Sequence, residues 1–116
     1  MRDVDRRIVN RFIHAGEGSR DEFRSKWAEV IVEMVRFSPR LVLISAGFDA
    51  HADDPLANCT LRDADYAWAT AAVMEACRSI DAADPPPVIS VLEGGYDLVA
   101  TAASAAAHVQ ALVAGW

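Results

Sequence analysis

Two short apolar runs, far apart in the sequence, constrain the fold of this chain more than any other feature. Leu41–Ile44 lies between Pro39 and Gly47, and Val88–Leu92 follows a run of three prolines. Continuous apolar runs of this length are typical of strands in a parallel sheet that is covered on both faces. Parallel strands need a long crossover connection, and the sequence between the runs is long enough for a helix. We therefore predict an α/β architecture.

Three segments have the spacing of helices. Apolar residues recur at intervals of three and four after Ser19, and this pattern ends at the Ser38–Pro39 step. The inner face expected for this helix consists of Phe23, Trp27, Val30, Ile31 and Met34. A second helix is expected to end near Ile80, with an inner face of Trp68, Ala71, Ala72, Cys77 and Ile80. The Ala-rich stretch Leu98–Ala114 predicts a third.

Local signals suggest where these elements begin. Ser19 and Glu22 have the spacing of a capping box, Thr60 with Asp63 can cap the second helix, and Asp97 can cap the third. Ile8–Ile13 is expected to form a short first strand. The predicted order is therefore strand, helix, strand, helix, strand, helix.

Composition limits the classes of function. The 116 residues carry a formal net charge of −6, which argues against binding to a phosphate backbone, and we expect no nucleic-acid partner. The N-terminal residues lack the apolar core of a signal peptide, and Leu98–Ala114 is shorter than a membrane span, so we expect no membrane association. Cys59 and Cys77 are the two cysteines and do not suggest a disulfide framework. A cytoplasmic location follows as the expectation.

Residues whose side chains can bind a metal or a substrate follow both predicted strands. In parallel sheets, binding sites form at these carboxyl ends of the strands. The first segment is Ser45–Leu56, which contains Asp49, His51 and Asp54, and the second is Glu93–Leu98, which contains Gly94, Gly95 and Tyr96. On the residues alone, the Asp-Asp-Pro sequence at 53–55 could simply form a turn. The two glycines could form a strand-to-helix turn in which Tyr96 covers the core with its ring.

Together the two segments resemble the end of the catalytic domain of the zinc-dependent histone deacetylase and acetylpolyamine amidohydrolase family. The resemblance implies a three-layer, parallel-sheet arginase/deacetylase-like fold, of which this chain is the C-terminal third. It also implies that Asp54 is a zinc ligand and that Tyr96 is catalytic, its hydroxyl donating to the oxyanion formed when water attacks an acetyl amide. The implied role of Asp49, His51, Gly94 and Gly95 is to shape the pocket around them.

The same resemblance implies that other parts of the active site are absent from this sequence. The family's tandem histidines and its separate Asp-x-His metal pair have no counterpart before residue 45. Catalytic zinc normally needs three protein ligands and a water molecule. We therefore expect residues 1–116 to be a partial catalytic domain that is inactive alone and does not retain Zn²⁺. The longer parent protein would hydrolyse an acetylated small molecule or acetyl-lysine.

Three alternatives remain open at this stage. Asp49, His51 and Asp54 could form a local metal site if their loop bends sharply. The chain could instead be a non-catalytic α/β module that self-associates through an exposed sheet edge. It could also be a truncation with no function of its own.

Overall fold

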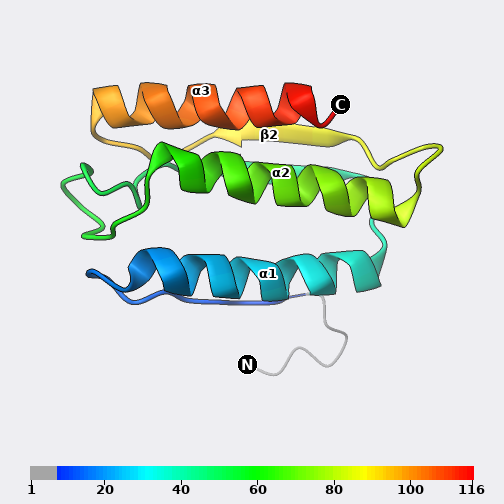
Figure 1. Ribbon diagram of the computed structural model, residues 1–116, viewed down its shortest axis with the longest axis horizontal. Coiled ribbons are helices and arrows are strands. Elements are labelled where there is room, and N and C mark those ends of the chain that lie inside the picture. The colour runs from blue at the N-terminus through cyan, green and yellow to red at the C-terminus, as the bar shows by residue number, and fades with distance from the viewer. Residues whose placement is uncertain (1–7) are drawn as a thin grey trace.

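The computed structural model describes residues 8–116 and contains three helices and two strands in that range. In chain order the elements are α1 Ser19–Phe37, β1 Val42–Ala46, α2 Asp63–Ile80, β2 Val88–Leu92 and α3 Leu98–Ala114 (Figure 1). The two apolar runs therefore become strands, and the three helical patterns become helices, as predicted.

The strands β1 and β2 form a parallel pair, in which Val42 lies opposite Val88 and Ala46 lies opposite Leu92. Helix α2 is part of the connection between them, as a parallel pair requires. Pairing continues beyond the strands, because the Glu93 N–H donates to the Ala46 carbonyl at 2.9 Å. The carboxyl ends of both strands are thereby held side by side.

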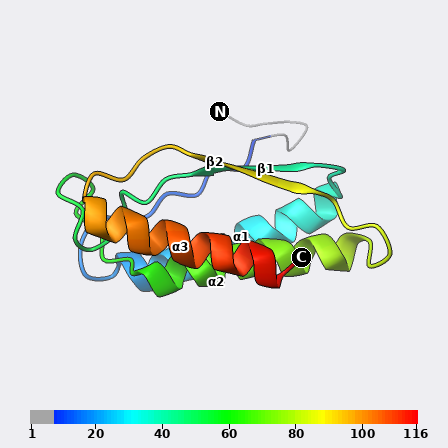
Figure 2. The ribbon, with the colours of Figure 1, turned by 90° about the horizontal axis from the view of Figure 1, so that it is seen from above.

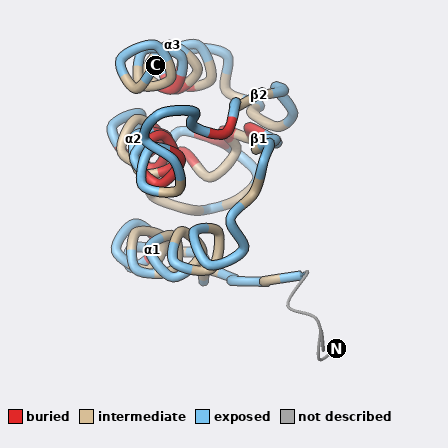
Figure 3. Tube along the Cα trace, turned by 90° about the vertical axis from the view of Figure 1, so that its right-hand side faces the viewer, coloured by how far each residue is buried: buried red, intermediate tan, exposed pale blue. Residues whose placement is uncertain are grey.

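All three helices lie on one face of the sheet, with α2 between α1 and α3 (Figures 2 and 3). The strand residues that point away from the helices are exposed, with Leu43 at 68%, Ile89 at 52% and Val91 at 58%. The prediction that the strands are buried on both faces is therefore not met within residues 8–116. No described element covers the outer face of the sheet.

The predicted first strand, Ile8–Ile13, is wrong, because this segment has no regular secondary structure. Arg11 instead pairs through its side chain with Glu29 of α1. Ile8 and Phe12 are 60% and 73% exposed, so the apolar side chains of this segment do not define a buried face that would hold it in a sheet.

The predicted capping box at the start of α1 is also wrong. The helix follows Gly18, which makes no side-chain cap. The Ser19 hydroxyl accepts the Thr60 N–H at 2.8 Å, and the Glu22 carboxylate accepts the His14 N–H at 2.8 Å. Both capping residues are thus engaged by partners outside the helix.

Helix α2 begins two residues later than the predicted cap at Thr60 implies. Its N-cap is Arg62, whose N–H donates to the buried Asp65 carboxylate at 2.9 Å. Asp65 also accepts from the side chains of Arg20 and Arg24 of α1, and this joins the two helices.

The inner face of α2 was predicted only in part. Cys77 is buried as expected, Trp68, Ala72 and Ile80 are partly buried, and Ala71 is exposed. The residues that α2 does bury are Asp65, Tyr66, Ala69, Thr70, Val73, Met74, Ala76 and Cys77. The cap of α3 is confirmed, because the Asp97 carboxylate accepts the Ala100 N–H at 2.8 Å.

A small core lies beneath the carboxyl ends of the strands. It is formed by Ala46, Phe48, Leu61 and Tyr66, and the Phe48 and Tyr66 rings meet edge to face with centroids 5.0 Å apart. This core supports the loops that follow both strands. Within residues 8–116, none of the helices has the length and apolar character needed to cross a bilayer.

Candidate functional site

The two segments selected from the sequence meet at one edge of the sheet. Beyond the strands, the Phe48 N–H donates to the Gly94 carbonyl at 2.8 Å. The Tyr96 N–H donates to the Asp54 carboxylate at 2.9 Å. The loop after β1 and the loop after β2 are therefore joined by direct hydrogen bonds, in agreement with the expectation that parallel strands bring their carboxyl ends together.

Asp54 is buried, with 7% of its surface exposed, and both carboxylate oxygens accept backbone hydrogen bonds. Oδ1 accepts the Leu56 N–H at 2.9 Å, and Oδ2 accepts the Tyr96 N–H. Burial by itself raises the pKa of Asp54, but these N–H groups, with those of Ala57 and Asp97, outweigh it and lower the pKa below its ordinary value. Asp54 is therefore a stably ionised carboxylate that bridges the two loops.

His51 is also buried, and both of its ring nitrogens face groups of its own loop region. The Asp53 N–H donates to Nδ1 at 3.1 Å, and Nε2 lies 3.5 Å from the Asp63 carboxylate. Because Nδ1 accepts, the proton of the neutral ring is on Nε2. The ring thus links the turn after β1 to the start of α2, an arrangement that fits a loop-shaping residue.

Asp49 lies where the backbones of the two loops approach each other. A Cβ atom added to Gly94 would lie 3.0 Å from the Asp49 carboxylate, and one added to Gly47 would lie 3.1 Å from its Oδ1. The Asp49 side chain therefore occupies the space that these two glycines leave open. Among the hydrogen bonds of residues 8–116, none involves the Asp49 carboxylate, in contrast to Asp54.

Tyr96 projects from the site toward solvent. Tyr96 is 58% exposed, so the alternative in which its ring covers the core is wrong. The preceding Gly95 has φ +138°, a conformation that side-chain-bearing residues rarely adopt. An added Cβ there would lie 2.5 Å from the Thr101 hydroxyl oxygen, so the turn also requires close approach to α3.

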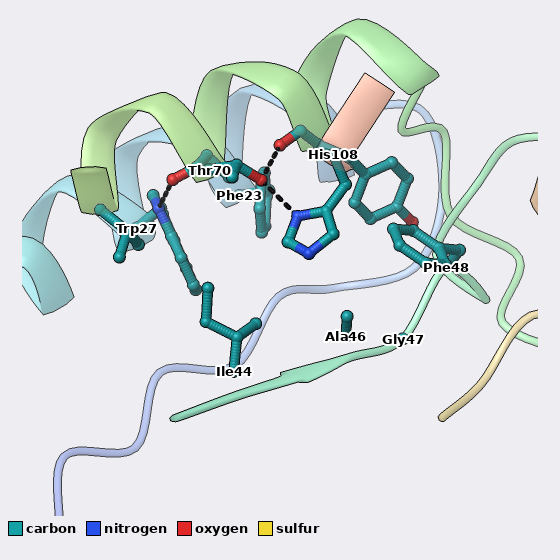
Figure 4. A pocket seen from close by; sticks show the side chains of 11 residues that line it. Phe23, Trp27, Ile44, Ala46, Gly47, Phe48, Thr70 and His108 are labelled. Carbon is teal, nitrogen blue, oxygen red and sulfur yellow. Dashed lines mark hydrogen bonds between the residues drawn. The ribbon is translucent and has the colours of Figure 1, made fainter. Parts of the chain in front are cut away.

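Beneath the site, a cavity of about 120 Å³ lies between β1, α1 and α2. Figure 4 shows His108 of α3 among its lining residues, hydrogen-bonded to Thr70. Thr70 donates to the Tyr66 carbonyl, so it accepts from His108 Nδ1, and Nε2 then accepts from Ser90 of β2 at 2.7 Å. Both ring nitrogens are hydrogen-bonded to neighbouring elements, so His108 is a packing residue that links α3 to α2 and β2.

Sequence reasoning gave no role to Tyr66, although its hydroxyl is buried without a hydrogen-bond partner. Burial and the nearby Asp49 and Asp54 charges raise its pKa well above its ordinary value, and the phenol therefore stays protonated. Its position four residues before Thr70 on α2 carries no local signal that would have distinguished it from an ordinary core residue.

The described residues do not by themselves build a metal site. In the part of the chain that the structure describes, no three His, Cys, Asp or Glu side chains converge as a metal site requires. The local site of Asp49, His51 and Asp54 is therefore not formed. These residues alone do not fit a catalytic zinc.

Comparison with known protein families gives a consistent match. The model of the histone deacetylase domain matches residues 3–112. Type-2 histone deacetylase 1 of Dictyostelium discoideum is 33% identical over 96 residues, which cover 83% of this chain and 6% of that protein. Histone deacetylase 15 of Arabidopsis thaliana is 35% identical over 98 residues, which cover 84% of this chain and 16% of that protein.

Solved structures agree with the fold. The HD domain of HDA15 superposes with a TM-score of 0.72 at 31% identity and covers 87% of this chain and 26% of that chain. An acetylpolyamine aminohydrolase from Burkholderia pseudomallei superposes with a TM-score of 0.67 at 23% identity, covering 86% of this chain and 26% of that chain, and supports the fold alone. The arginase/deacetylase fold class predicted from the sequence is thereby confirmed. The chain spans only about a quarter of each of these structures.

Proposed function

This chain belongs to the histone deacetylase domain family, and from that premise we propose that residues 1–116 form the C-terminal part of a zinc-dependent deacetylase domain. The observation that carries the proposal is the meeting of the two strand-end loops, which brings Asp49, Asp54 and Tyr96 to one edge of the sheet. The proposed reaction of the longer protein is hydrolysis of an acetyl amide, in an acetylated small molecule or in acetyl-lysine.

In this proposal Tyr96 is the catalytic residue that the chain supplies. Its exposed side chain leaves the hydroxyl available to a substrate above the strand ends. A hydroxyl donor aimed at a developing oxyanion contributes on the order of 3 kcal/mol to transition-state stabilisation. When bound, zinc would polarise the acyl carbonyl and a water molecule.

The chain offers two carboxylates as possible metal ligands, and the sequence prediction selects Asp54. That assignment stays a prediction, and the hydrogen bonds now favour Asp49. The two oxygens of Asp54 accept N–H groups, whereas no described hydrogen bond occupies the Asp49 carboxylate. We therefore propose Asp49 as the carboxylate that this chain presents to the metal, with the other ligands coming from the rest of the domain.

Two assays test the proposed function. The purified chain should release no acetate from acetyl-lysine peptides or acetylpolyamines, and elemental analysis after dialysis should find no retained zinc. The chain should then replace its matched segment in the Arabidopsis histone deacetylase 15 domain. The chimera should bind zinc and deacetylate, and Tyr96→Phe should lower kcat at least a hundredfold, as expected when an oxyanion donor is lost.

A chimera that folds and binds zinc but has no activity with any acetylated substrate would contradict the proposed function. Zinc bound by the chain alone, together with deacetylation, would contradict the proposal that it is only part of a site. The unaltered plant domain is the positive control for both assays.

The exposed outer face of the sheet supports a second candidate function, a non-catalytic module that self-associates. Leu43, Ile89 and Val91 together present an apolar surface next to unpaired strand edges. Light scattering at increasing concentration should then detect oligomers, and Leu43→Lys should reduce their mass. A monomer at all concentrations would exclude this function.

A further inference from the structure

The cavity beneath the strand-end loops has a volume of about 120 Å³, and the proposed reaction makes no use of it. Its lining includes three small residues, Ala46, Gly47 and Ala69, which leave space that the larger side chains around them do not fill. Figure 4 shows the His108 ring and the Ile44 side chain directed into this space above Ala46. The cavity is therefore a feature of how α1, α2, α3 and β1 pack together.

The lining of the cavity is uncharged and offers little to water. Among the described residues that line it, none is Asp, Glu, Lys or Arg. The Trp27 Nε1–H donates to the Ala69 carbonyl at 3.0 Å, and the Thr70 hydroxyl binds both the Tyr66 carbonyl and the His108 ring. The Tyr66 hydroxyl is the buried group of this lining that lacks a partner. One such group falls short of the roughly two to four polar partners that a buried water molecule needs.

The walls of the cavity are suited to a flat ring. The Phe23 and Trp27 rings stack with centroids 5.7 Å apart, and the Phe48 and Tyr66 rings meet edge to face. Aromatic rings prefer such offset and edge-to-face contacts with one another. Phe23, Trp27 and Ile44 are only partly buried, so the space between α1 and β1 offers a way in. A dry apolar cavity of about 150 Å³ can bind benzene or xenon, and this cavity is of similar size.

We propose that this cavity is a binding site for a small, uncharged aromatic molecule of one ring. The inference is independent of the proposed deacetylase function. An occupant would contact Phe48, whose N–H donates to the Gly94 carbonyl at 2.8 Å and whose carbonyl accepts the His51 N–H at 3.2 Å. The bound molecule would therefore lie against the residue that joins the two strand-end loops.

Titration of the full chain with benzene, followed by amide NMR spectra, tests the site. We expect saturable shifts at the Gly47 and Phe48 amides, which belong to the wall of the cavity. Benzoate is the control of equal ring size, and it should bind at least tenfold more weakly because its carboxylate would be buried without a partner. Absence of saturation with benzene, or equal affinity for benzoate, would overturn the proposal.

A variant that fills the cavity tests its location. Leucine is a good helix former, so Ala69→Leu should keep α2 while placing extra carbon atoms in the cavity. The affinity for benzene should fall at least tenfold. Ala71→Leu, at an exposed position of the same helix, is the matched control and should bind benzene as the unaltered chain does. If Ala69→Leu does not fold, Ala46→Val fills the cavity from β1, where a branched side chain is well tolerated. Unchanged affinity in a folded filling variant would overturn the proposal.

The exposed outer face of the sheet is the competing apolar surface for benzene. Leu43 lies on that face and does not line the cavity. Leu43→Lys should therefore leave the affinity for benzene unchanged. If Leu43→Lys lowers this affinity tenfold or more while Ala69→Leu does not, benzene binds to the outer face and the cavity is not the site.

Discussion

Replacing Gly95 with alanine should destabilise the fold through two separable effects. The residue has φ +138°, where a side chain causes backbone strain, and an added Cβ would approach Thr101 of α3. Gly16 offers a natural comparison, because its φ is +106° but nothing lies within 4 Å of its added Cβ. Gly16→Ala therefore measures backbone strain without the steric contact.

The magnitudes follow from these contacts. A residue with a side chain in a sparsely populated backbone region costs about 1–3 kcal/mol. The new Cβ at position 95 would lie 2.5 Å from Thr101 Oγ1 and 3.1 Å from its Cγ2, so the threonine must leave its preferred rotamer. An off-rotamer side chain costs about 0.5–1.5 kcal/mol. We expect Gly95→Ala to lower the free energy of unfolding by about 2–4 kcal/mol, a large part of the 5–15 kcal/mol typical of a domain.

Urea denaturation followed by circular dichroism measures these changes. Gly95→Ala should lower the midpoint further than Gly16→Ala does. Measured in a Thr101→Ala background, the cost of Gly95→Ala should shrink by about 1 kcal/mol, because the clashing side-chain atoms are absent. Equal costs at positions 95 and 16, or no recovery in the Thr101→Ala background, would refute the steric part of the reasoning.

Two further predictions concern buried polar groups. Burial lowers the pKa of His108, so the folded state resists its protonation; stability should be fully present above about pH 6.5 and fall as the pH drops below it. Urea midpoints from pH 8 to pH 5 should show this slope, and His108→Gln should flatten it. Asp65→Ala should cost about 2–3 kcal/mol, because the buried carboxylate accepts charge-assisted bonds from α1, while the partly exposed Arg20 and Arg24 can rehydrate. If the urea midpoint of Asp65→Ala equals that of the unaltered chain within error, the hydrogen bonds to Asp65 contribute nothing to the free energy of unfolding.

Local patterns in the sequence predicted the helices and strands that residues 8–116 form, although they also predicted a strand at Ile8–Ile13 that is absent. The apolar run Val88–Leu92 becomes β2, the spacing that starts at Ser19 becomes α1, and Asp97 caps α3. Each of these features depends on residues within a few positions of one another. Periodicity and capping chemistry act over that range, so they could be read without knowledge of the tertiary structure.

Long-range contacts account for what the sequence did not reveal. Ser19 has a capping residue's spacing to Glu22, yet its hydroxyl binds Thr60, which is 41 residues away. The bond between Asp54 and Tyr96 similarly spans 42 residues. Its position in a motif was enough to select Asp54 as a candidate site residue. The hydrogen-bond partners of Asp54 depend on how the two loops pack, which the motif does not show.

Because β1 and β2 are parallel, the loops that carry the candidate site and the turn between α2 and β2 lie at opposite ends of the strands. The turn between α2 and β2, at residues 81–84, is exposed and lies at the amino end of β2. The loops that carry Asp49 and Tyr96 lie at the opposite end of the strands. Extra residues inserted in that turn would extend into solvent without moving either loop, so homologues can differ there in length while keeping the same arrangement of side chains at the other edge.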